Sequence, residues 1–486
     1  MNEITAPTIA DSSLDPQDWG PFRALLHRMV DDMVDHVAGL EAGPVWTRMP
    51  DALRDELRTP LPRTGLGADV AYAEFQRLVL PYGASNIHPA FMGWVQGGGN
   101  PAGMAAEFLA AALNANLGGR DHAAIEVERQ VIRWSAEMVG LPETASGLLV
   151  TGTSIANFIA VLIARAQALG PAIRREGLGD ARLAAYTSTA AHGCIPRALD
   201  MAGIGSAQLR AVPTDPLGRM QLDALAAMIA ADRRAGVTPF LVVGTAGTVD
   251  TGAIDDLAGL AGLCAAEGVR FHVDGAFGAL AMLSPDLRSS LAGIERADSV
   301  AFDFHKWGQV PYDAGCILVR DGADQLATFA QNAAYLRRET RGLAGGHPWP
   351  CDLGPDLSRG FRALKVWMTL KAYGADRLGA VVDRCCALAR RLAMHVEAEP
   401  ALEMLAPVPL NIVCFRVRDG AGDLDRLNAD IVADLQEAGI AAPSTTTIGG
   451  RLAIRAAIVN HRTSEREIDR LIPAVLEAAR ARQVRV

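Results

Sequence analysis

From about residue 86 onward the sequence alternates short apolar segments with longer amphipathic ones, and this alternation constrains the fold more than any other feature. The short segments have the length of buried strands, and some are separated by stretches long enough for a helix, for example 155–169. Six strands are predicted, at 147–151, 184–187, 240–244, 269–273, 299–303 and 315–319. Strands joined by helices of this size predict an α/β fold, a mostly parallel sheet with helices on both faces.

Two further regions flank this α/β region. The first 85 residues are predicted to be helical, because apolar side chains recur there at helical spacing. After residue 370 a long helix is followed by strand-like segments and two more helices, which is typical of a small α+β domain. We therefore expect an N-terminal helical segment over 1–85, a large α/β domain over 86–370 and a small C-terminal domain over 371–486.

Composition excludes several classes of protein. Half of the 486 residues are hydrophobic, which argues against a mostly disordered chain, and the net charge of −9 argues against a nucleic-acid partner. No apolar run approaches the length of a membrane span, and the first residues lack the features of a secretory signal. The seven cysteines are an odd number without a CxxC pair, so neither a disulfide framework nor a metal site is indicated. These features predict a cytoplasmic protein without a membrane partner.

Lysine is very scarce in this chain. Of 46 basic residues only Lys306, Lys365 and Lys371 are lysines. A coding bias towards arginine explains most of this, but it would not readily remove a lysine whose chemistry arginine cannot perform. Lys365 and Lys371 fall on a predicted helix and are expected on a solvated face, whereas Lys306 follows a predicted strand that ends at Asp303.

Polar residues also follow other predicted strands, where ligands of a parallel sheet bind. Thr153 and Ser154 lie at the predicted start of a helix. They either form an anion-binding site or serve as an ordinary N-cap. His192 follows the next strand, and Asp274 ends another, either capping its turn or facing a protonated ring nitrogen. Together with Lys306 these residues match the needs of pyridoxal phosphate, which uses a lysine, an acid at its pyridine nitrogen and hydroxyls at its phosphate.

At these residues the chain resembles the group II pyridoxal-phosphate-dependent decarboxylases. This fold-type-I family includes the aromatic-L-amino-acid, histidine and glutamate decarboxylases. The resemblance spans about residues 86–480, and its most specific stretches are His-Val-Asp-Gly-Ala-Phe-Gly at 272–278 and Ala-Asp-Ser-Val-Ala-Phe-Asp-Phe-His-Lys-Trp at 297–307.

The resemblance implies roles for individual residues. Lys306 would form the Schiff base with the cofactor, Asp274 would pair with its pyridine nitrogen and His192 would stack on its ring. The remaining cofactor contacts would be Thr153 and Ser154 at the phosphate, Thr248 near the ring substituents, Ala276 against the ring and His305 beside the lysine. Asp303 stands where aromatic decarboxylases carry an asparagine near the phosphate, and it is expected to pair with an arginine or with His305. The resemblance also implies a homodimer, with N-terminal helices that wrap the partner and an active site at the interface.

The source of the last proton is an open question at this point. Family decarboxylases carry a tyrosine in the loop before the long helix, and the corresponding loop, placed at about 336–356, contains none. His347 or Cys351 could replace it, and the histidine has the better-placed pKa. Alternatively, His347 is an ordinary loop residue and the tyrosine position has been misplaced.

The predicted reaction is the decarboxylation of an L-amino acid to its amine and carbon dioxide. Loss of the tyrosine hydroxyl is typical of the aldehyde synthases of this family, in which oxygen reacts in place of the proton, so oxidative deamination to an aldehyde is the alternative. A catalytically silent relative that binds the cofactor is a third possibility, which retention of Lys306, Asp274 and His192 argues against. His88 and Trp94 could line a substrate pocket or belong to the core, and the sequence does not identify the amino acid.

Overall fold

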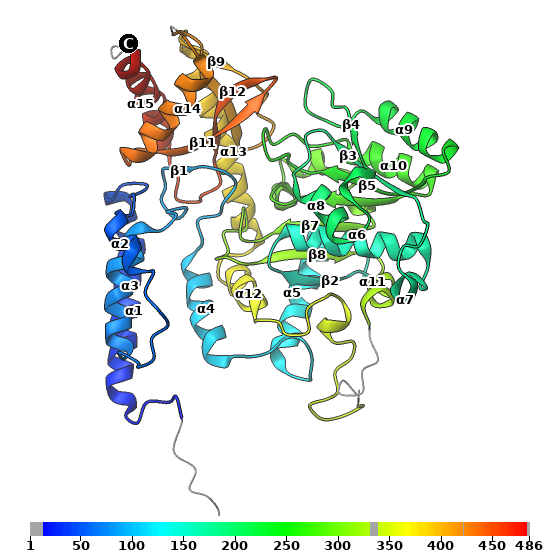
Figure 1. The fold of residues 1–486 in the computed structure, drawn as a ribbon, viewed down its shortest axis with the longest axis horizontal. Coiled ribbons are helices and arrows are strands. Elements are labelled where there is room, and N and C mark those ends of the chain that lie inside the picture. The colour runs from blue at the N-terminus through cyan, green and yellow to red at the C-terminus, as the bar shows by residue number, and fades with distance from the viewer. Residues whose placement is uncertain (1–12, 331–338, 421, 484–486) are drawn as a thin grey trace, which may run out of the picture.

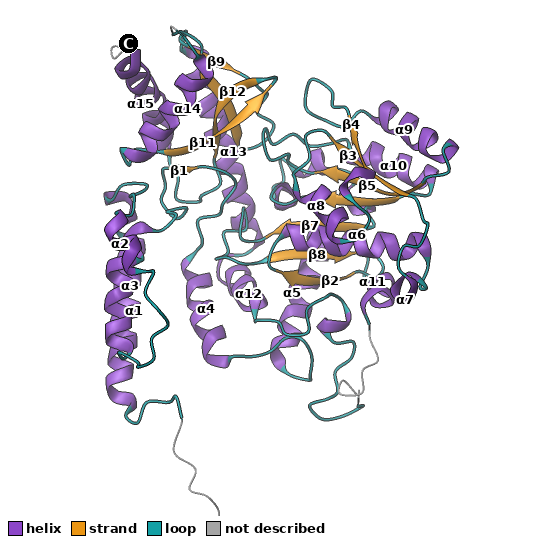
Figure 2. Cartoon of the chain, in the orientation of Figure 1, coloured by secondary structure: helices purple, strands orange, loops and turns teal. Residues whose placement is uncertain are grey.

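The large sheet of the computed structural model, which describes residues 13–330, 339–420 and 422–483, has seven strands in the order β2-β8-β7-β6-β5-β3-β4 (Figures 1 and 2). The strands are β2 (Ser146–Val150), β3 (Leu183–Ser188), β4 (Leu209–Val212), β5 (Thr238–Thr245), β6 (Arg270–Asp274), β7 (Ser299–Asp303) and β8 (Gly315–Val319). All run parallel except β8, which is antiparallel to both of its neighbours. The six predicted strands are present. β4 was not predicted because it is a four-residue edge strand in which only Val212 is buried.

Helices cover both faces of this sheet, which confirms the predicted α/β fold class (Figure 2). One face carries α6 (Thr153–Leu169) with α7 (Ile173–Glu176), α8 (Cys194–Met201) and α11 (Gly322–Phe329) packed beside it. The other face carries α5 (Ala123–Val139), α9 (Leu222–Arg234), α10 (Leu257–Glu267) and α12 (Arg362–Tyr373). Because both faces are covered, β5 and β8 are nearly continuous apolar runs, and β6 and β7 are buried although they carry polar side chains such as His272 and Ser299.

A second sheet of five strands forms the smaller part of the molecule, in the order β1-β11-β12-β10-β9. Its strands are β1 (Phe91–Met92), β9 (Leu402–Met404), β10 (Ile412–Val417), β11 (Ala442–Ile448) and β12 (Arg451–Ala457), with helices α13 (Ala375–Ala398), α14 (Leu424–Glu437) and α15 (Glu465–Gln483). β1, which was not predicted, pairs in parallel with β11, so residues 91 and 92 join the small sheet although the expected boundary places them in the large domain. A strand of two residues is too short to show the alternating pattern of a strand in the sequence, so the sequence does not reveal its pairing with β11.

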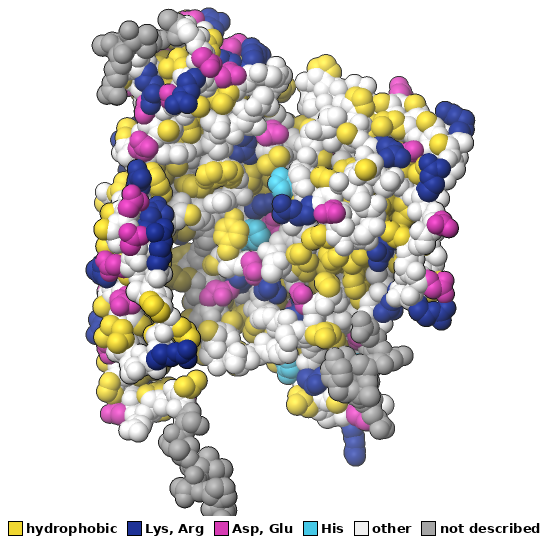
Figure 3. Space-filling view, in the orientation of Figure 1, with side chains coloured by type: hydrophobic (Ala, Val, Ile, Leu, Met, Phe, Trp, Pro, Cys, Tyr) yellow, Lys and Arg dark blue, Asp and Glu magenta, His cyan; other side chains and the backbone are white. Residues whose placement is uncertain are grey.

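An N-terminal arm runs along one side of the molecule (Figure 1). It contains α1 (Trp19–Ala38), α2 (Asp51–Glu56) and α3 (Ala68–Leu78), and α4 (Pro101–Leu113) follows between the arm and α12. Apolar side chains show at the surface of this region in Figure 3. Among the described helices, none combines the length and the apolar character that crossing a bilayer requires.

A buried ion pair fixes the strand that leads to α6. Arg359 and Glu128 have side chains that are 1% and 4% exposed, and Arg359 Nη1 donates to Glu128 Oε2 at 3.0 Å. Arg359 also donates to the carbonyl oxygens of Leu117 and Leu149, while Glu128 accepts from the backbone N–H of Leu149. The pair therefore ties β2 to α5 and to the segment before α12, since Leu149 lies in β2.

Replacing Arg359 with methionine is expected to lower the free energy of unfolding by about 3–5 kcal/mol, because Glu128 would be left buried without its partner. The measurement is urea denaturation of the cofactor-free protein followed by circular dichroism. The matched control is Arg58→Met, which breaks the exposed pair with Asp55 and should cost less than about 1 kcal/mol. Equal losses in the two variants would contradict the structural role assigned to Arg359.

Candidate active site

The carboxyl ends of the parallel strands meet at one edge of the large sheet, and a cavity of about 400 Å³ lies there. The strands β5, β6 and β7 and the start of α6 contribute to its wall. The predicted site residues that line it are Trp94, Thr153, Ser154, His192, Asp274, Ala276, Asp303, His305 and Lys306. Residues that are far apart in sequence, such as Trp94, His192 and Lys306, are thus brought together as the topology predicts.

Lys306 follows β7 and forms the ion pair of this cavity. Its Nζ lies 2.9 Å from Oδ2 of Asp303, and Oδ1 of Asp303 accepts a hydrogen bond from the backbone N–H of Thr153 at 2.7 Å. Burial by itself lowers the pKa of Lys306, but the Asp303 carboxylate outweighs it and leaves the pKa above its ordinary value. Asp303 therefore pairs with the lysine rather than with an arginine, and Nε2 of His305 lies 3.6 Å from its Oδ2.

Asp274 is the last residue of β6 and is almost fully buried. Its Oδ1 accepts from the backbone N–H of Ala276 at 3.1 Å, and its Oδ2 accepts from Asn157 Nδ2 at 3.0 Å. Burial raises the pKa of Asp274, while Lys306 and Asn157 act in the opposite direction. The carboxylate caps its turn, which confirms one interpretation offered by the sequence, and it also borders the cavity. Its pairing with a ring nitrogen stays a prediction.

Two histidine rings border the cavity, one of them exposed and the other buried. His192 is exposed, and its Nδ1 accepts the backbone N–H of Cys194 at 3.2 Å. His305 is buried beside Tyr312, with ring centroids 4.3 Å apart, and its Nδ1 accepts the backbone N–H of Ala314 at 3.0 Å. Burial lowers the pKa of His305, which favours the neutral ring.

The start of α6 offers donors to an anion. Gly152 precedes the helix, and the hydroxyl of Thr153 is buried without a hydrogen-bond partner in the described structure. The first N–H groups of a 17-residue helix lack intrahelical acceptors and favour negative charge. An exposed hydroxyl follows at Ser154. This end of the cavity is therefore suited to a phosphate.

Thr248 does not line the cavity, in contrast to its expected place near the ring substituents. Its hydroxyl is used inside the turn after β5, where it bonds to the hydroxyl of Thr251 at 3.1 Å and accepts the N–H of Ala253 at 3.0 Å. Thr245, the last residue of β5, lines the cavity instead, with a buried hydroxyl that has no partner among the described residues. Its place at a strand end was the signal that could have identified it.

His88 and His347 also lie outside this cavity. His88 is buried, accepts the N–H of Ala90 at 3.0 Å through Nδ1, and borders a separate cavity beside the N-terminal arm. His347 is exposed, and its ring stacks on Trp349 with centroids 4.7 Å apart. The expected places of His88 at the substrate and of His347 at the reacting carbon are therefore not reproduced within this protomer.

The connection before α12 begins earlier than the predicted loop. α11 ends at Phe329 and α12 begins at Arg362, whereas the loop was expected over 336–356. In sequence the connection therefore includes Tyr335, which lies outside the described residues. The statement that this connection lacks a tyrosine is wrong, because it depended on a start at residue 336.

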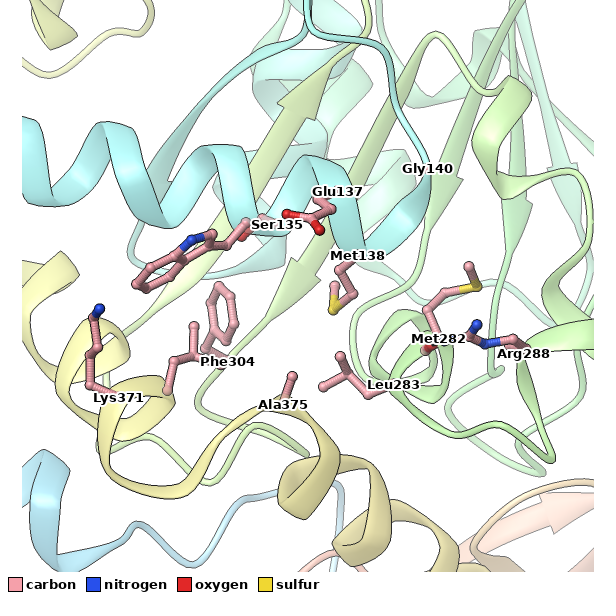
Figure 4. Close-up of a pocket in the computed structure, with 12 residues that line it drawn as sticks. Ser135, Glu137, Met138, Gly140, Met282, Leu283, Arg288, Phe304, Lys371 and Ala375 are labelled. Atoms are coloured by element: carbon pink, nitrogen blue, oxygen red, sulfur yellow. Dashed lines mark hydrogen bonds between the residues drawn. The ribbon is translucent and has the colours of Figure 1, made fainter.

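A larger cavity of about 590 Å³ opens between α5, α12 and the turn after β6 (Figure 4). Most of its lining is apolar, with Met138, Leu283 and Phe304 in the middle and Lys371 at one end. Lys371 is exposed, and its Nζ lies 5.4 Å from the ring centroid of Trp134. None of the predicted site residues lines this cavity, so it is not the candidate for catalysis.

Comparisons with known proteins identify the family of this chain. Residues 50–418 match the pyridoxal-dependent decarboxylase conserved domain. The chain is 33% identical over 456 residues to the aromatic-L-amino-acid decarboxylase of Bacillus atrophaeus, covering 92% of this chain and 93% of that protein. It is 33% identical over 466 residues to the L-2,4-diaminobutyrate decarboxylase of Rhizobium meliloti, covering 94% and 92%. The crystal structure of Oryza sativa TDC with PLP and tryptamine superposes with a TM-score of 0.89 at 27% identity, covering 97% of this chain and all of that one.

Proposed function

The chain belongs to the pyridoxal-dependent decarboxylase family, and from this membership we propose the residues, the substrate class and the assembly with which it works. The protein is a carboxy-lyase that uses pyridoxal phosphate to convert an L-amino acid into an amine and carbon dioxide. The observation that carries the residue assignment is the cavity at the strand ends, where Lys306, Asp274 and the start of α6 meet.

The residues present at this cavity fit the cofactor. Lys306 is the one lysine at its wall, and Asp274 is a buried carboxylate whose charge calls for a cationic partner. The orphaned hydroxyl of Thr153, the adjacent Ser154 and the start of α6 supply donors for the phosphate. His192 supplies a flat ring that is exposed at the cavity. We assign these residues to cofactor binding and place Ala276 and Thr245 at the ring. Thr248 is not assigned to the cofactor.

The mechanism assigns each of these residues one task. Pyridoxal phosphate, when bound, supplies the electron sink that accepts the bonding pair of the departing carboxylate. Lys306 must lose a proton before its Nζ can act as a nucleophile, and while it is protonated Oδ2 of Asp303, 2.9 Å away, holds the ammonium group in place. Asp274 holds negative charge at the buried end of the cavity, where it stabilises a protonated ring nitrogen.

We propose an aromatic L-amino acid as the substrate. Beyond the cofactor residues, the cavity wall includes Trp94, Tyr312, Val95, Gln96 and Val249. The rings of Trp94 and Tyr312 are 58% and 49% exposed, which leaves apolar surface for an aromatic side chain. The single Lys or Arg side chain in the described wall, Lys306, is paired with Asp303, so an acidic side chain would find no free cation.

A substrate panel tests this proposal. The reconstituted enzyme is incubated with L-tryptophan, L-tyrosine, L-phenylalanine, L-glutamate and L-2,4-diaminobutyrate, and carbon dioxide is measured. We expect kcat/KM for one of the aromatic substrates to exceed that for the last two by at least about 100-fold, since a buried unpaired charge is costly. Replacing Trp94 with alanine should raise KM for the aromatic substrate by about tenfold. A preference for glutamate or diaminobutyrate would overturn the assignment.

We propose that the enzyme works as a homodimer joined through α1 and α4. Both helices expose large apolar side chains, namely Trp19, Val30 and Val34 on α1 and Phe108, Leu109 and Leu113 on α4. Side chains of α1 and Phe108 together border a cavity of about 570 Å³. A patch of this kind is expensive to leave in water and is typical of a protein interface.

The double variant Leu109→Glu/Leu113→Glu is expected to lower the mass in solution from about twice 51.3 kDa to 51.3 kDa at micromolar concentration, because charge would be buried at the interface. Sedimentation velocity measures this change. Met394→Glu alters an equally exposed apolar side chain on α13, away from α1 and α4, and should leave the dimer intact. A wild-type monomer would contradict the proposal, as would a double variant that stays dimeric.

We propose that Tyr335, rather than His347, supplies the proton to the α-carbon after carbon dioxide has left. The family resemblance implies a tyrosine in the connection before the long helix, and Tyr335 lies in that connection by sequence. His347 is exposed and stacked on Trp349, away from the wall of the cavity. With a phenol in the connection, the reason to expect an aldehyde synthase falls away.

We also propose a reducing, cytoplasmic location. The seven cysteines are all buried and form no disulfide with one another. Chains kept in an oxidising compartment more often carry disulfides.

A further inference from the structure

A row of buried polar side chains leads from Asp274 across the large sheet. Asn157 on α6 comes first, His272 on β6 second and Ser299 on β7 third, and these three side chains are 0%, 1% and 6% exposed. Asn157 Nδ2 donates to Asp274 Oδ2 at 3.0 Å, Asn157 Oδ1 lies 2.8 Å from His272 Nε2, and His272 Nδ1 lies 2.8 Å from Ser299 Oγ. Among the four residues, Asp274 alone lines the cavity.

With Asp274 ionised, as pairing with a protonated ring nitrogen requires, the hydrogen-bond chemistry of this row allows one arrangement of protons. An ionised carboxylate only accepts, so the amide nitrogen of Asn157 must face Asp274 and its oxygen must face His272. His272 therefore carries its proton on Nε2 and presents Nδ1 as an acceptor, to which the hydroxyl of Ser299 donates. Full burial lowers the pKa of His272 to about 3, so the ring is neutral, as this arrangement requires.

The position of Asp274 depends on this row. It is the last residue of β6, and its Oδ1 accepts from the backbone N–H of Ala276 while its Oδ2 accepts from Asn157. The thiol of Cys194 is the other side chain near Oδ2, at 3.6 Å, and it also lies 3.2 Å from Asn157 Nδ2. Asn157 is therefore the strongest donor that orients the carboxylate and stabilises its charge.

We propose that Asn157, His272 and Ser299 form a positioning relay that keeps Asp274 ionised and fixed for pairing with a protonated ring nitrogen. This inference rests on the role of Asp274 in the proposed function. The relay touches neither substrate nor reacting atoms, and its effect is confined to the strength of one charge pair. Removing it should weaken ligands that carry the ring nitrogen and spare ligands that lack it.

The test measures binding to cofactor-free protein, using pyridoxamine 5′-phosphate and its 1-deaza analogue, in which a C–H replaces the ring nitrogen. Neither probe has an aldehyde, so Lys306 cannot bind it covalently. Asn157→Leu is expected to weaken pyridoxamine phosphate by about 10- to 100-fold and the deaza analogue by less than about threefold. The matched control is Asn428→Leu, which removes another fully buried asparagine, in α14, and should change neither affinity.

Equal losses for both probes in Asn157→Leu would overturn the relay, because they would indicate a general loss of packing. Unchanged binding of both probes would overturn it as well. If the wild-type protein binds neither probe, the proposed function fails instead. If the wild type and Asn157→Leu both bind pyridoxamine phosphate tightly, the relay is ruled out and the proposed function is unaffected.

A second measurement examines the relay without any ligand. In cofactor-free protein labelled with ¹⁵N-histidine, His272 should appear as the neutral Nε2–H form, assigned by the loss of its signals in His272→Gln. Ser299→Ala removes the donor to Nδ1, so the signals of the other tautomer or of exchange should appear. A wild-type ring that is charged or protonated on Nδ1 would overturn the proposed order of protons.

Discussion

Replacing Lys306 with alanine is expected to lower kcat for decarboxylation by on the order of 10⁴-fold or more, because the cavity then loses its one lysine amine. The other two lysines cannot substitute for it. Lys365 is buried in an ion pair with Glu107 at 2.7 Å, although a solvated position was expected, and Lys371 lies at the separate apolar cavity. The measurements are carbon dioxide release at saturating substrate and the visible absorption of protein reconstituted with pyridoxal phosphate.

The variant Lys306→Arg separates charge from covalent chemistry. Arginine retains a positive charge that can pair with Asp303, but it stays protonated and cannot act as a nucleophile. We therefore expect the same loss of activity as in Lys306→Ala, together with retention of the folded state. Lys371→Ala removes an exposed lysine and should keep kcat within about twofold of the wild type. An active Lys306→Arg enzyme would contradict the covalent role.

The fold could be predicted where the sequence repeats a pattern that packing enforces. β5 and β8 are buried on both faces and are nearly continuous apolar runs, and both were recognised. β6 and β7 are also buried, and they were recognised although they carry polar side chains at His272 and Ser299. The polar residue at each strand end then follows from the chain topology. Asp274 and Asp303 were identified in this way, and both lie at the cavity wall.

Contacts that depend on distant parts of the chain were not predictable. β1 is a strand because β11 pairs with it, 350 residues later, and nothing local marks it. Asn157 looks like an ordinary buried residue of α6, and its importance arises only where β6 brings His272 and Asp274 beside it. Thr248 was placed near the ring substituents from the family resemblance, and sequence alone does not reveal that its turn uses this hydroxyl.

The product formed at the α-carbon depends on which side chain delivers the last proton. The end of α11 determines which side chains belong to the connection before α12. With α11 ending at Phe329, the connection to α12 contains both Tyr335 and His347. A phenol is a general acid with a pKa near 10 and a neutral hydroxyl at physiological pH, so it can donate without first binding a proton. His347 is exposed and stacks on Trp349, and it does not line the cavity, so its ring is not placed to donate there.

Replacing Tyr335 with phenylalanine is therefore expected to lower amine formation by about 10²- to 10⁴-fold, the usual contribution of a general acid, and to make carbon dioxide release consume oxygen. His347→Gln should change amine formation by less than about threefold, since the ring lies outside the cavity of its own protomer. An oxygen electrode combined with amine quantification distinguishes the two outcomes. If His347→Gln loses amine while Tyr335→Phe keeps it, the histidine is the donor. If the wild-type enzyme itself takes up oxygen in step with carbon dioxide, it is an aldehyde synthase and neither residue serves as the proton source.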